Sequence, residues 1–263
     1  MNWILLLSPN SDGVTNMARD EALLDLVRDT EGPSGIVRIY GWSHPVLSLG
    51  RHQRARDIYS PERASSLGVE IVRRPTGGRA VLHKREITYA AAGRIHPGST
   101  LRDAAAIVDG LLLATLERLG VSAAVANPAA RAPAPDAAPC FALPVRGELL
   151  ANDLKLVGSA QWREDDAWMQ HGSILVEDDQ SMIEMIAHDP SGQSSGSLAT
   201  LAALLGRTVS NAEFHASLRE VLRDQHLLAN ESDHADARIA ARVDELANRL
   251  AARYADDAWT WRR

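Results

Sequence analysis

A pair of adjacent glycines between arginines constrains this chain more than any other feature. Residues 73–83 read RRPTGGRAVLH, and the apolar stretch 69–72 comes directly before them. Glycines let a backbone approach a ligand closely and expose its N–H groups, while neighbouring arginines supply positive charge. The segment therefore predicts a strand–turn–strand unit that binds an anionic or carbonyl-bearing ligand.

The overall composition is that of an ordinary globular protein. Of the 263 residues, 45% are hydrophobic and 24% are charged, which is enough to build a sizeable core. The net charge of −6 argues against nucleic acid as a general partner. A single cysteine excludes an internal disulfide and favours the reducing cytoplasm.

The N-terminal stretch and the known motif patterns narrow the class further. Residues 1–7 are apolar, but they lack a basic region and are too short for a signal peptide or a membrane span. They predict a first strand and no membrane association. No zinc-type spacing of Cys and His, no Walker loop and no Rossmann fingerprint is present, so we expect no metal site.

Basic residues are concentrated in one short part of this acidic chain. Arg73, Arg74, Arg79, Lys84 and Arg85 all fall within residues 73–85. Such a cluster predicts a local positive patch that steers an acidic protein or a phosphate-bearing group toward a site. The alternative is an ordinary solvated basic edge.

The remaining pattern predicts an α+β fold with a mixed sheet and flanking helices. Asn152-Asp153 is typical of a hairpin turn. The expected strands are 36–40, 46–49, 69–73, 86–92, 149–151, 155–160 and 173–176.

Helix signals lie between and after these strands. Thr15 or Asn16 is the expected cap of a helix over 17–28, and Ser60-Pro61 opens a short helix that Gly68 ends. A further helix covers 101–119, with Gly120 behind it. From about residue 198 the chain is helical. There Ser210 and Glu213 fit a capping box, and the last helix has one apolar face made of Ile239, Val243, Leu246, Leu250 and Tyr254.

A proline- and alanine-rich segment interrupts this pattern at residues 126–139. It contains four prolines and no periodicity, which predicts a mobile or extended loop that leads to Cys140. A lone cysteine is commonly a small buried hydrophobe, but loops run over the surface and carry function. A nucleophilic thiol also needs a nearby cation to lower its pKa from about 8.5.

Lys155 is the candidate for that cation. It is one of only two lysines, and leucines flank it in an apolar strand. The alternative is an edge-strand lysine whose stem covers apolar surface. His83 and His171 are the nearest histidines and have the chemistry of an acid, a base or a hydrogen-bond donor, although structural histidines are commoner. The pattern does not support a Cys-His-Asp triad.

Several of these motifs together resemble the biotin/lipoate A/B protein ligase family. Residues 73–83 are similar to its signature, and residues 42–45 with 48–53 resemble its upstream strand motif. The first helix at 16–23, the Lys155–Gln161 segment, residues 170–175 and the ending with Tyr254 and Trp259-Thr260 match as well. The resemblance runs nearly end to end.

This resemblance implies the catalytic-domain fold of the family, which is similar to class II aminoacyl-tRNA synthetases, as a single domain over 1–263. The Thr-Gly-Gly-Arg form of the motif and the Pro-Cys-Phe segment resemble the single-domain octanoyltransferases. These enzymes move octanoate from acyl carrier protein to a lysine of the glycine cleavage H protein or another lipoyl domain.

By resemblance, Cys140 is the acyl-thioester nucleophile and Lys155 lowers its pKa, with no cofactor. The substrate-binding residues would be Arg74, Thr76, Gly77, Gly78, Arg79, Ala80, Val81, His83, Gly158, Ser159, Ala160 and His171.

Two alternatives stay open from the sequence. One is an ATP- and Mg-dependent lipoate–protein ligase, or an amidotransferase that moves lipoyl groups between carrier domains. Lys84-Arg85 stands where the ligases usually have an acidic residue, which weakens the ATP and Mg interpretation. The other is a non-catalytic relative that keeps the acyl pocket and binds an effector.

Overall fold

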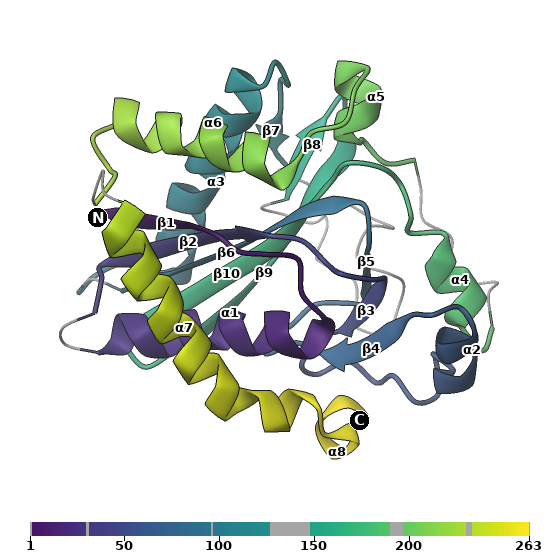
Figure 1. The fold of residues 1–263 in the computed structure, drawn as a ribbon. Coiled ribbons are helices and arrows are strands. Elements are labelled where there is room, and N and C mark those ends of the chain that lie inside the picture. The colour runs from purple at the N-terminus through teal and green to yellow at the C-terminus, as the bar shows by residue number, and fades with distance from the viewer. Residues whose placement is uncertain are drawn as a thin grey trace.

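A seven-stranded mixed sheet forms the centre of the molecule (Figure 1). The computed structural model describes residues 2–29, 32–95, 97–126, 148–189, 197–229 and 233–262. The strand order is β1-β2-β6-β10-β9-β8-β7, with β1 parallel to β2 and all other neighbours antiparallel. The strands are β1 (Trp3–Leu7), β2 (Gly35–Tyr40), β6 (Glu86–Arg94), β7 (Ala124–Val125), β8 (Leu149–Ala151), β9 (Leu154–Glu164) and β10 (Ala167–Leu175).

A second sheet of three strands carries the glycine motif. Its order is β4-β3-β5, with β3 (Val46–Leu49) between β4 (Glu70–Arg73) and β5 (Val81–His83). β3 is parallel to β4 and antiparallel to β5. Residues 74–80 therefore cross the end of β3, so the strand–turn–strand prediction is confirmed with a third strand inserted between the two arms.

Helices cover both faces of the large sheet (Figure 1). On one face lie α3 (Leu101–Arg118) and α6 (Asn211–Asp224), and on the other lie α1 (Gly13–Arg28) and α7 (Asp233–Tyr254). Each face has its own apolar cluster, one with Trp3, Trp168 and Phe214 and the other with Met17 and Tyr40. The α+β architecture with a mixed sheet is thus confirmed.

Four short helices complete the part of the fold that the structure describes. α2 (Pro61–Ser66) and α4 (Met182–Ile186) pack beside the three-stranded sheet, where a third apolar cluster forms. α5 (Leu201–Leu205) follows later in the chain, and α8 (Asp257–Thr260) contacts β4. The predicted apolar face of α7 is confirmed, since Val243 and Tyr254 are buried against α1 and its neighbours.

The helix caps differ from the prediction at α1 and at α6. α1 begins earlier than expected, because Asp12 accepts a hydrogen bond from the Thr15 N–H at 2.7 Å. The prediction of Thr15 or Asn16 as the cap is therefore wrong, and both residues lie inside the helix. Ser60 caps α2 as predicted. Ser210 caps α6, whereas the Glu213 carboxylate pairs with Arg207.

The hairpin between β8 and β9 is confirmed, and both β9 and β10 are longer than predicted. Asn152 and Asp153 adopt φ angles of 51° and 62°, as a tight hairpin turn requires. In β10 the residues from Ala167 to His171 are all buried, because helices cover both sheet faces. A strand buried on both sides lacks the period-two alternation that identifies a half-exposed strand.

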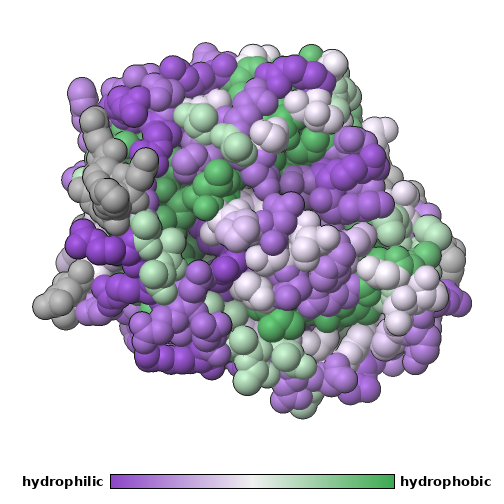
Figure 2. Space-filling model, in the orientation of Figure 1, coloured by the Kyte–Doolittle hydropathy of each residue, from purple (hydrophilic) through white to green (hydrophobic). Residues whose placement is uncertain are grey.

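Two further predictions concern the proline-rich segment and membrane association. Residues 127–139 and Cys140 lie outside the described residues, so the predicted loop stays a prediction. Hydrophilic side chains cover much of the face in Figure 2, with apolar residues in separate areas. Within the described ranges, every helix is too short or too polar to cross a lipid bilayer.

Candidate active site

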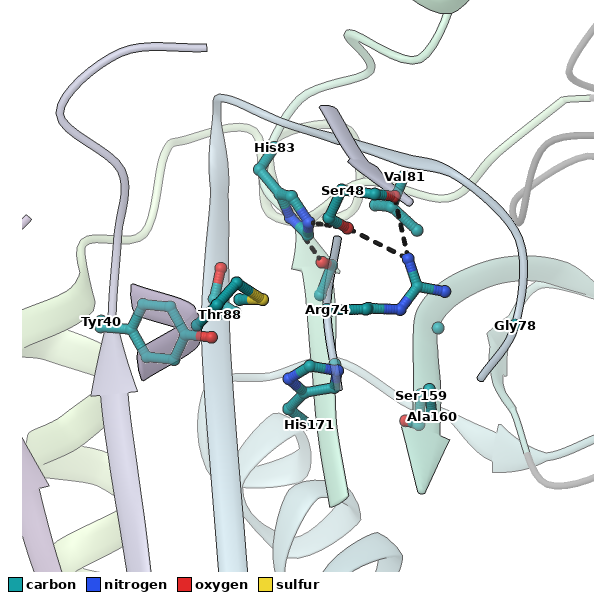
Figure 3. A pocket seen from close by; sticks show the side chains of 14 residues that line it. Tyr40, Ser48, Arg74, Gly78, Val81, His83, Thr88, Ser159, Ala160 and His171 are labelled. Atoms are coloured by element: carbon teal, nitrogen blue, oxygen red, sulfur yellow. Dashed lines mark hydrogen bonds between the residues drawn. The ribbon is translucent and has the colours of Figure 1, made fainter. Parts of the chain in front are cut away.

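A pocket lies between the large sheet, the three-stranded sheet and α1 (Figure 3). It encloses about 420 Å³ of space that protein atoms do not fill, including its opening to solvent. Tyr40 and Thr88 lie toward one end, and Gly78, Ser159 and Ala160 toward the other. Its wall is formed by Met17, Tyr40, Ser48, Arg74, Gly78, Val81, His83, Thr88, Gly158, Ser159, Ala160, His171, Gly172 and Ser173.

The wall includes eight of the twelve residues that the sequence assigns to substrate binding. These are Arg74, Gly78, Val81, His83, Gly158, Ser159, Ala160 and His171, which come from residues 74–83, from β9 and from β10. The other four do not line the pocket. Thr76 is buried behind His171, Gly77 and Arg79 form the loop through their carbonyl groups, and Ala80 packs in the core of the small sheet.

Arg74 shapes the glycine loop from inside. Its guanidinium donates hydrogen bonds to the carbonyl oxygens of Ser48 at 2.9 Å, Gly77 at 2.8 Å and Arg79 at 2.7 Å. Gly78 has a φ of +91°, which disfavours any residue with a side chain. A Cβ on Gly50 would lie 1.9 Å from the Gly78 carbonyl oxygen, so both glycines are required for the loop to close over β3.

The prediction of a basic surface patch is wrong. Arg73, Arg74 and Arg79 are buried, because the loop turns them inward. Arg73 donates to the carbonyl oxygens of Gln53 and Thr260, each at 2.8 Å. Lys84 and Arg85 reach the surface but pair with Asp179. The cluster is therefore neither a steering patch nor a solvated edge. Arg73 and Arg74 instead donate hydrogen bonds to backbone carbonyl groups of the same chain.

One polar cluster surrounds His171, and we call it the Asp20 cluster. The Asp20 carboxylate accepts from His171 Nδ1 at 2.8 Å, from Arg38 at 2.9 Å and from the Tyr40 hydroxyl at 2.7 Å. His171 Nε2 lies 2.6 Å from the Thr76 hydroxyl. Burial lowers the pKa of His171, and the hydrogen bond to Asp20 opposes that shift. Burial also raises the pKa of Tyr40 and lowers that of Arg38.

A second polar cluster surrounds His83, and we call it the Glu86 cluster. Glu86 Oε1 lies 2.7 Å from His83 Nδ1 and accepts from Ser173 at 2.8 Å and Thr88 at 2.6 Å. His83 Nε2 lies 2.7 Å from the Ser48 hydroxyl. Both clusters thus fix a pocket histidine between a carboxylate and a hydroxyl group.

A third chain of hydrogen bonds runs from the pocket toward α3. The Ser159 hydroxyl lies 2.7 Å from the Tyr89 hydroxyl, which accepts from Gln170 at 2.9 Å. Gln170 also donates to Asp109 at 3.3 Å. Burial raises the pKa of Asp109 to about 6, against the opposing effect of the Gln170 hydrogen bond. The chain fixes Ser159 on the pocket wall through residues of β6, β10 and α3.

Lys155 lies on β9 near the pocket but does not line it. Its side chain is 1% exposed and forms an ion pair with Glu148, which is also buried. Cys140, the other residue predicted to be catalytic, lies outside the described residues. The structure therefore gives the environment of the lysine and leaves the pairing of the two as a prediction. No group of three or more His, Cys, Asp or Glu side chains in the described ranges is arranged to hold a metal ion.

The sequence analysis gave no site role to several residues that build the pocket. Met17, Tyr40, Ser48, Thr88, Gly172 and Ser173 line it, Asp20 and Glu86 hold its histidines, and Arg38 pairs with Asp20. The signal in the sequence that identifies such pocket residues is a polar residue within an otherwise apolar strand or helix. Ser48 stands between Leu47 and Leu49 in a fully buried strand, and Asp20 interrupts the apolar positions of α1.

Comparison with known proteins agrees with the fold and the motifs. The family model described as the lipoyl protein ligase A/B catalytic domain matches residues 12–223. A protein from Kyrpidia tusciae named octanoyltransferase LipM is 35% identical over 99% of both chains. A protein of the same name from Geobacillus kaustophilus is 34% identical over 99% of this chain and 98% of its own.

A solved structure agrees in fold. Lipoate-protein ligase A bound with ATP superimposes with a TM-score of 0.77 at 20% identity and 99% coverage of both chains. The predicted ligase-type fold is thus confirmed. By its motifs, its pocket and its match over residues 12–223, this chain belongs to the lipoyl protein ligase A/B catalytic domain family.

Proposed function

We propose that this chain is an octanoyltransferase of lipoate biosynthesis that works through a thioester on Cys140. Octanoyl-acyl carrier protein would be the donor, and a lysine of a lipoyl domain or of the glycine cleavage H protein would be the acceptor. The observation that carries the proposal is similarity over 99% of the chain to proteins named octanoyltransferase LipM. We also infer a single catalytic domain and a cytoplasmic location.

The pocket supports this function by its lining. An octanoyl group has six methylenes, and burying each contributes about 0.8 kcal/mol, so the chain would contribute about 5 kcal/mol to binding. The apolar side chains and side-chain atoms of Met17, Tyr40 and Val81 on the pocket wall suit such a chain. The glycine loop and the Gly158-Ser159 segment would then lie near the acyl carbonyl group.

The chemistry needs no nucleotide. The Cys140 thiolate attacks the donor thioester carbonyl, the pantetheine sulfur leaves, and an octanoyl-cysteine thioester remains. The acceptor lysine amine then attacks this thioester, the Cys140 thiolate leaves, and an amide forms. The first transfer is nearly isoenergetic and the second is downhill. The covalent intermediate lets the donor protein depart before the acceptor arrives.

Lys155 would act on Cys140 as one half of an ion pair. A cation near a thiol lowers its pKa, whereas the Glu148 carboxylate that pairs with Lys155 opposes this effect. Lys155→Ala should therefore slow the alkylation of Cys140 by iodoacetamide at pH 7, and Glu148→Gln should accelerate it. Unchanged alkylation rates in both variants would remove Lys155 from this role.

Intact mass spectrometry tests the function. The protein is incubated with octanoyl-acyl carrier protein, and an adduct of one octanoyl group is expected that neutral hydroxylamine removes. The hydroxylamine-labile adduct should disappear in Cys140→Ala, together with octanoylation of an added lipoyl domain. Octanoylation of the lipoyl domain that survives Cys140→Ala would overturn the proposal.

An ATP-dependent ligase is the second candidate, because the fold matches a ligase structure bound with ATP. The same incubation separates the two functions when free octanoate and MgATP replace the acyl carrier protein. Acceptor octanoylation that requires ATP would support the ligase. If neither donor yields an adduct or a product, a non-catalytic acyl-binding role is supported.

A further inference from the structure

Ser48, His83 and Glu86 stand in the order of a serine–histidine–acid triad. The Ser48 hydroxyl lies 2.7 Å from His83 Nε2, and His83 Nδ1 lies 2.7 Å from Glu86 Oε1. The three residues come from β3, β5 and the start of β6. Ser48 and His83 both line the pocket (Figure 3), so the hydroxyl end of the array faces the space proposed for the acyl chain.

The surroundings fix His83 in one orientation. The Trp42 ring stacks on the imidazole with 4.2 Å between ring centroids. Glu86 is buried, and its Oε1 also accepts hydrogen bonds from Ser173 and Thr88. A carboxylate that accepts these bonds leaves the imidazole proton on Nδ1 and makes Nε2 the basic nitrogen toward Ser48.

Arg74 completes the array on the other side of the serine. Its Nη1 donates to Ser48 Oγ at 3.1 Å. The hydroxyl thus accepts from a guanidinium and has its own proton directed at His83 Nε2. A fixed positive charge at this distance favours the transfer of the Ser48 hydroxyl proton to His83, because it stabilises negative charge on Oγ as the proton leaves.

From this arrangement we infer a second activity, the hydrolysis of acyl thioesters through an ester on Ser48. The inference rests on the proposed function only for the class of ligand, a medium-chain acyl thioester. It does not involve Cys140. Nucleophile, base and orienting acid are the elements that acyl transfer to a serine requires.

The steps balance without a further reactant except water. His83 Nε2 takes the Ser48 proton while Ser48 Oγ bonds to the thioester carbonyl carbon, and the carbon–sulfur bond breaks. The leaving thiolate takes that proton from Nε2. Water then attacks the ester, His83 takes one water proton and returns it to Ser48 Oγ, and free fatty acid is released.

The test uses the Cys140→Ala full-length protein, which removes the proposed transfer thiol. Octanoyl-pantetheine is the probe, and free thiol release and intact mass are measured. We expect thiol release and an octanoyl adduct that resists neutral hydroxylamine but is cleaved at alkaline pH, as an ester is. Adding Ser48→Ala should abolish the adduct and reduce thiol release at least tenfold, whereas Ser65→Ala, at an exposed serine of α2, should change neither.

Two further variants separate chemistry from folding. Ser48→Cys should restore an adduct, now labile to neutral hydroxylamine, because a thiol replaces the hydroxyl at the same position. Glu86→Gln tests the positioning role of Glu86, and we expect it to reduce the rate at least tenfold and to displace the acid limb of the pH–rate profile, where the general base becomes protonated. Circular dichroism shows whether each variant is folded.

The outcomes also separate this inference from the proposed function. No adduct in Cys140→Ala or in its Ser48→Cys derivative, while the wild type still octanoylates a lipoyl domain, overturns the inference alone. Loss of lipoyl-domain octanoylation in the wild type overturns the proposed function, and a Ser48-dependent adduct would still support the second activity. Thiol release that persists in Ser48→Ala assigns hydrolysis to another residue and overturns the inference.

Discussion

The Asp20 cluster and the Glu86 cluster both fix a histidine of the pocket, but the carboxylates at their centres have different partners. Each holds a pocket histidine between a carboxylate and a hydroxyl group. Asp20 also pairs with Arg38, and both side chains are fully buried. Glu86 instead receives hydrogen bonds from neutral donors such as Thr88 and Ser173 in addition to His83.

The difference separates a structural ion pair from a polarised histidine. The Asp20 carboxylate pairs with the Arg38 guanidinium, which is permanently charged, so His171 is only one of its several partners. Asp20 therefore acts on His171 mainly by fixing the position of its ring through a hydrogen bond. Glu86 directs its charge at His83, and the other hydrogen-bond donors to its carboxylate in the described part of the chain are the neutral side chains of Trp42, Thr88 and Ser173. The two clusters should therefore respond differently when each carboxylate is neutralised.

The largest effect is expected for Asp20→Asn. This change leaves the buried Arg38 guanidinium without its counter-ion, and breaking a buried pair by removing one partner costs about 3–5 kcal/mol. Urea unfolding followed by circular dichroism measures the loss. Asp244→Ala is the control, because its pair with Arg19 is exposed at the aspartate and should contribute less than about 1 kcal/mol.

A smaller loss is expected for the matched change Glu86→Gln. The amide keeps an oxygen for Ser173 and Thr88 and leaves no arginine unpaired, so the cost is that of imperfect hydrogen bonding, about 1–3 kcal/mol. The same urea titration measures it. Equal losses in Glu86→Gln and Asp20→Asn would show that the two clusters do not differ in the way described.

The two clusters also show which contacts of the site the sequence alone can predict. Local signals predicted β3, the Ser60 cap and the Asn152-Asp153 hairpin, because each depends on neighbours within a few residues. His83 and Glu86 are three residues apart, so their pairing is also local. The pairing of His171 with Asp20 spans 151 positions and depends on how α1 packs on β10.

The buried arginines are a feature that the sequence alone predicts wrongly. Arginine is usually exposed, so a run such as Arg73-Arg74 predicts a surface patch. Here the loop folds back over β3, and carbonyl oxygens of β3 and of the loop accept hydrogen bonds from the buried Arg74 guanidinium in place of water. That outcome depends on backbone geometry around Gly50 and Gly78, which composition and spacing do not encode.

The smallest expected effect is a difference in pH dependence at His171. Because burial lowers the pKa of His171 below its ordinary value of 6.5, the unfolded chain binds a proton that the folded chain does not between those two pKa values. Stability then rises with pH through this window, is complete above about pH 6.5, and falls as the pH is lowered, by at most about 1.4 kcal/mol per pH unit for one site. His171→Gln should flatten the dependence of the unfolding free energy between pH 5.5 and 7.5, since glutamine does not titrate. His226→Gln, at an exposed turn distant in sequence from both clusters, controls for the loss of one imidazole.

A slope in His171→Gln as steep as in the wild type would mean that His171 titrates alike in the folded and unfolded chains. In that case Asp20 would stabilise the imidazolium form enough to cancel the cost of burial, and the Asp20 cluster would polarise its histidine as the Glu86 cluster does.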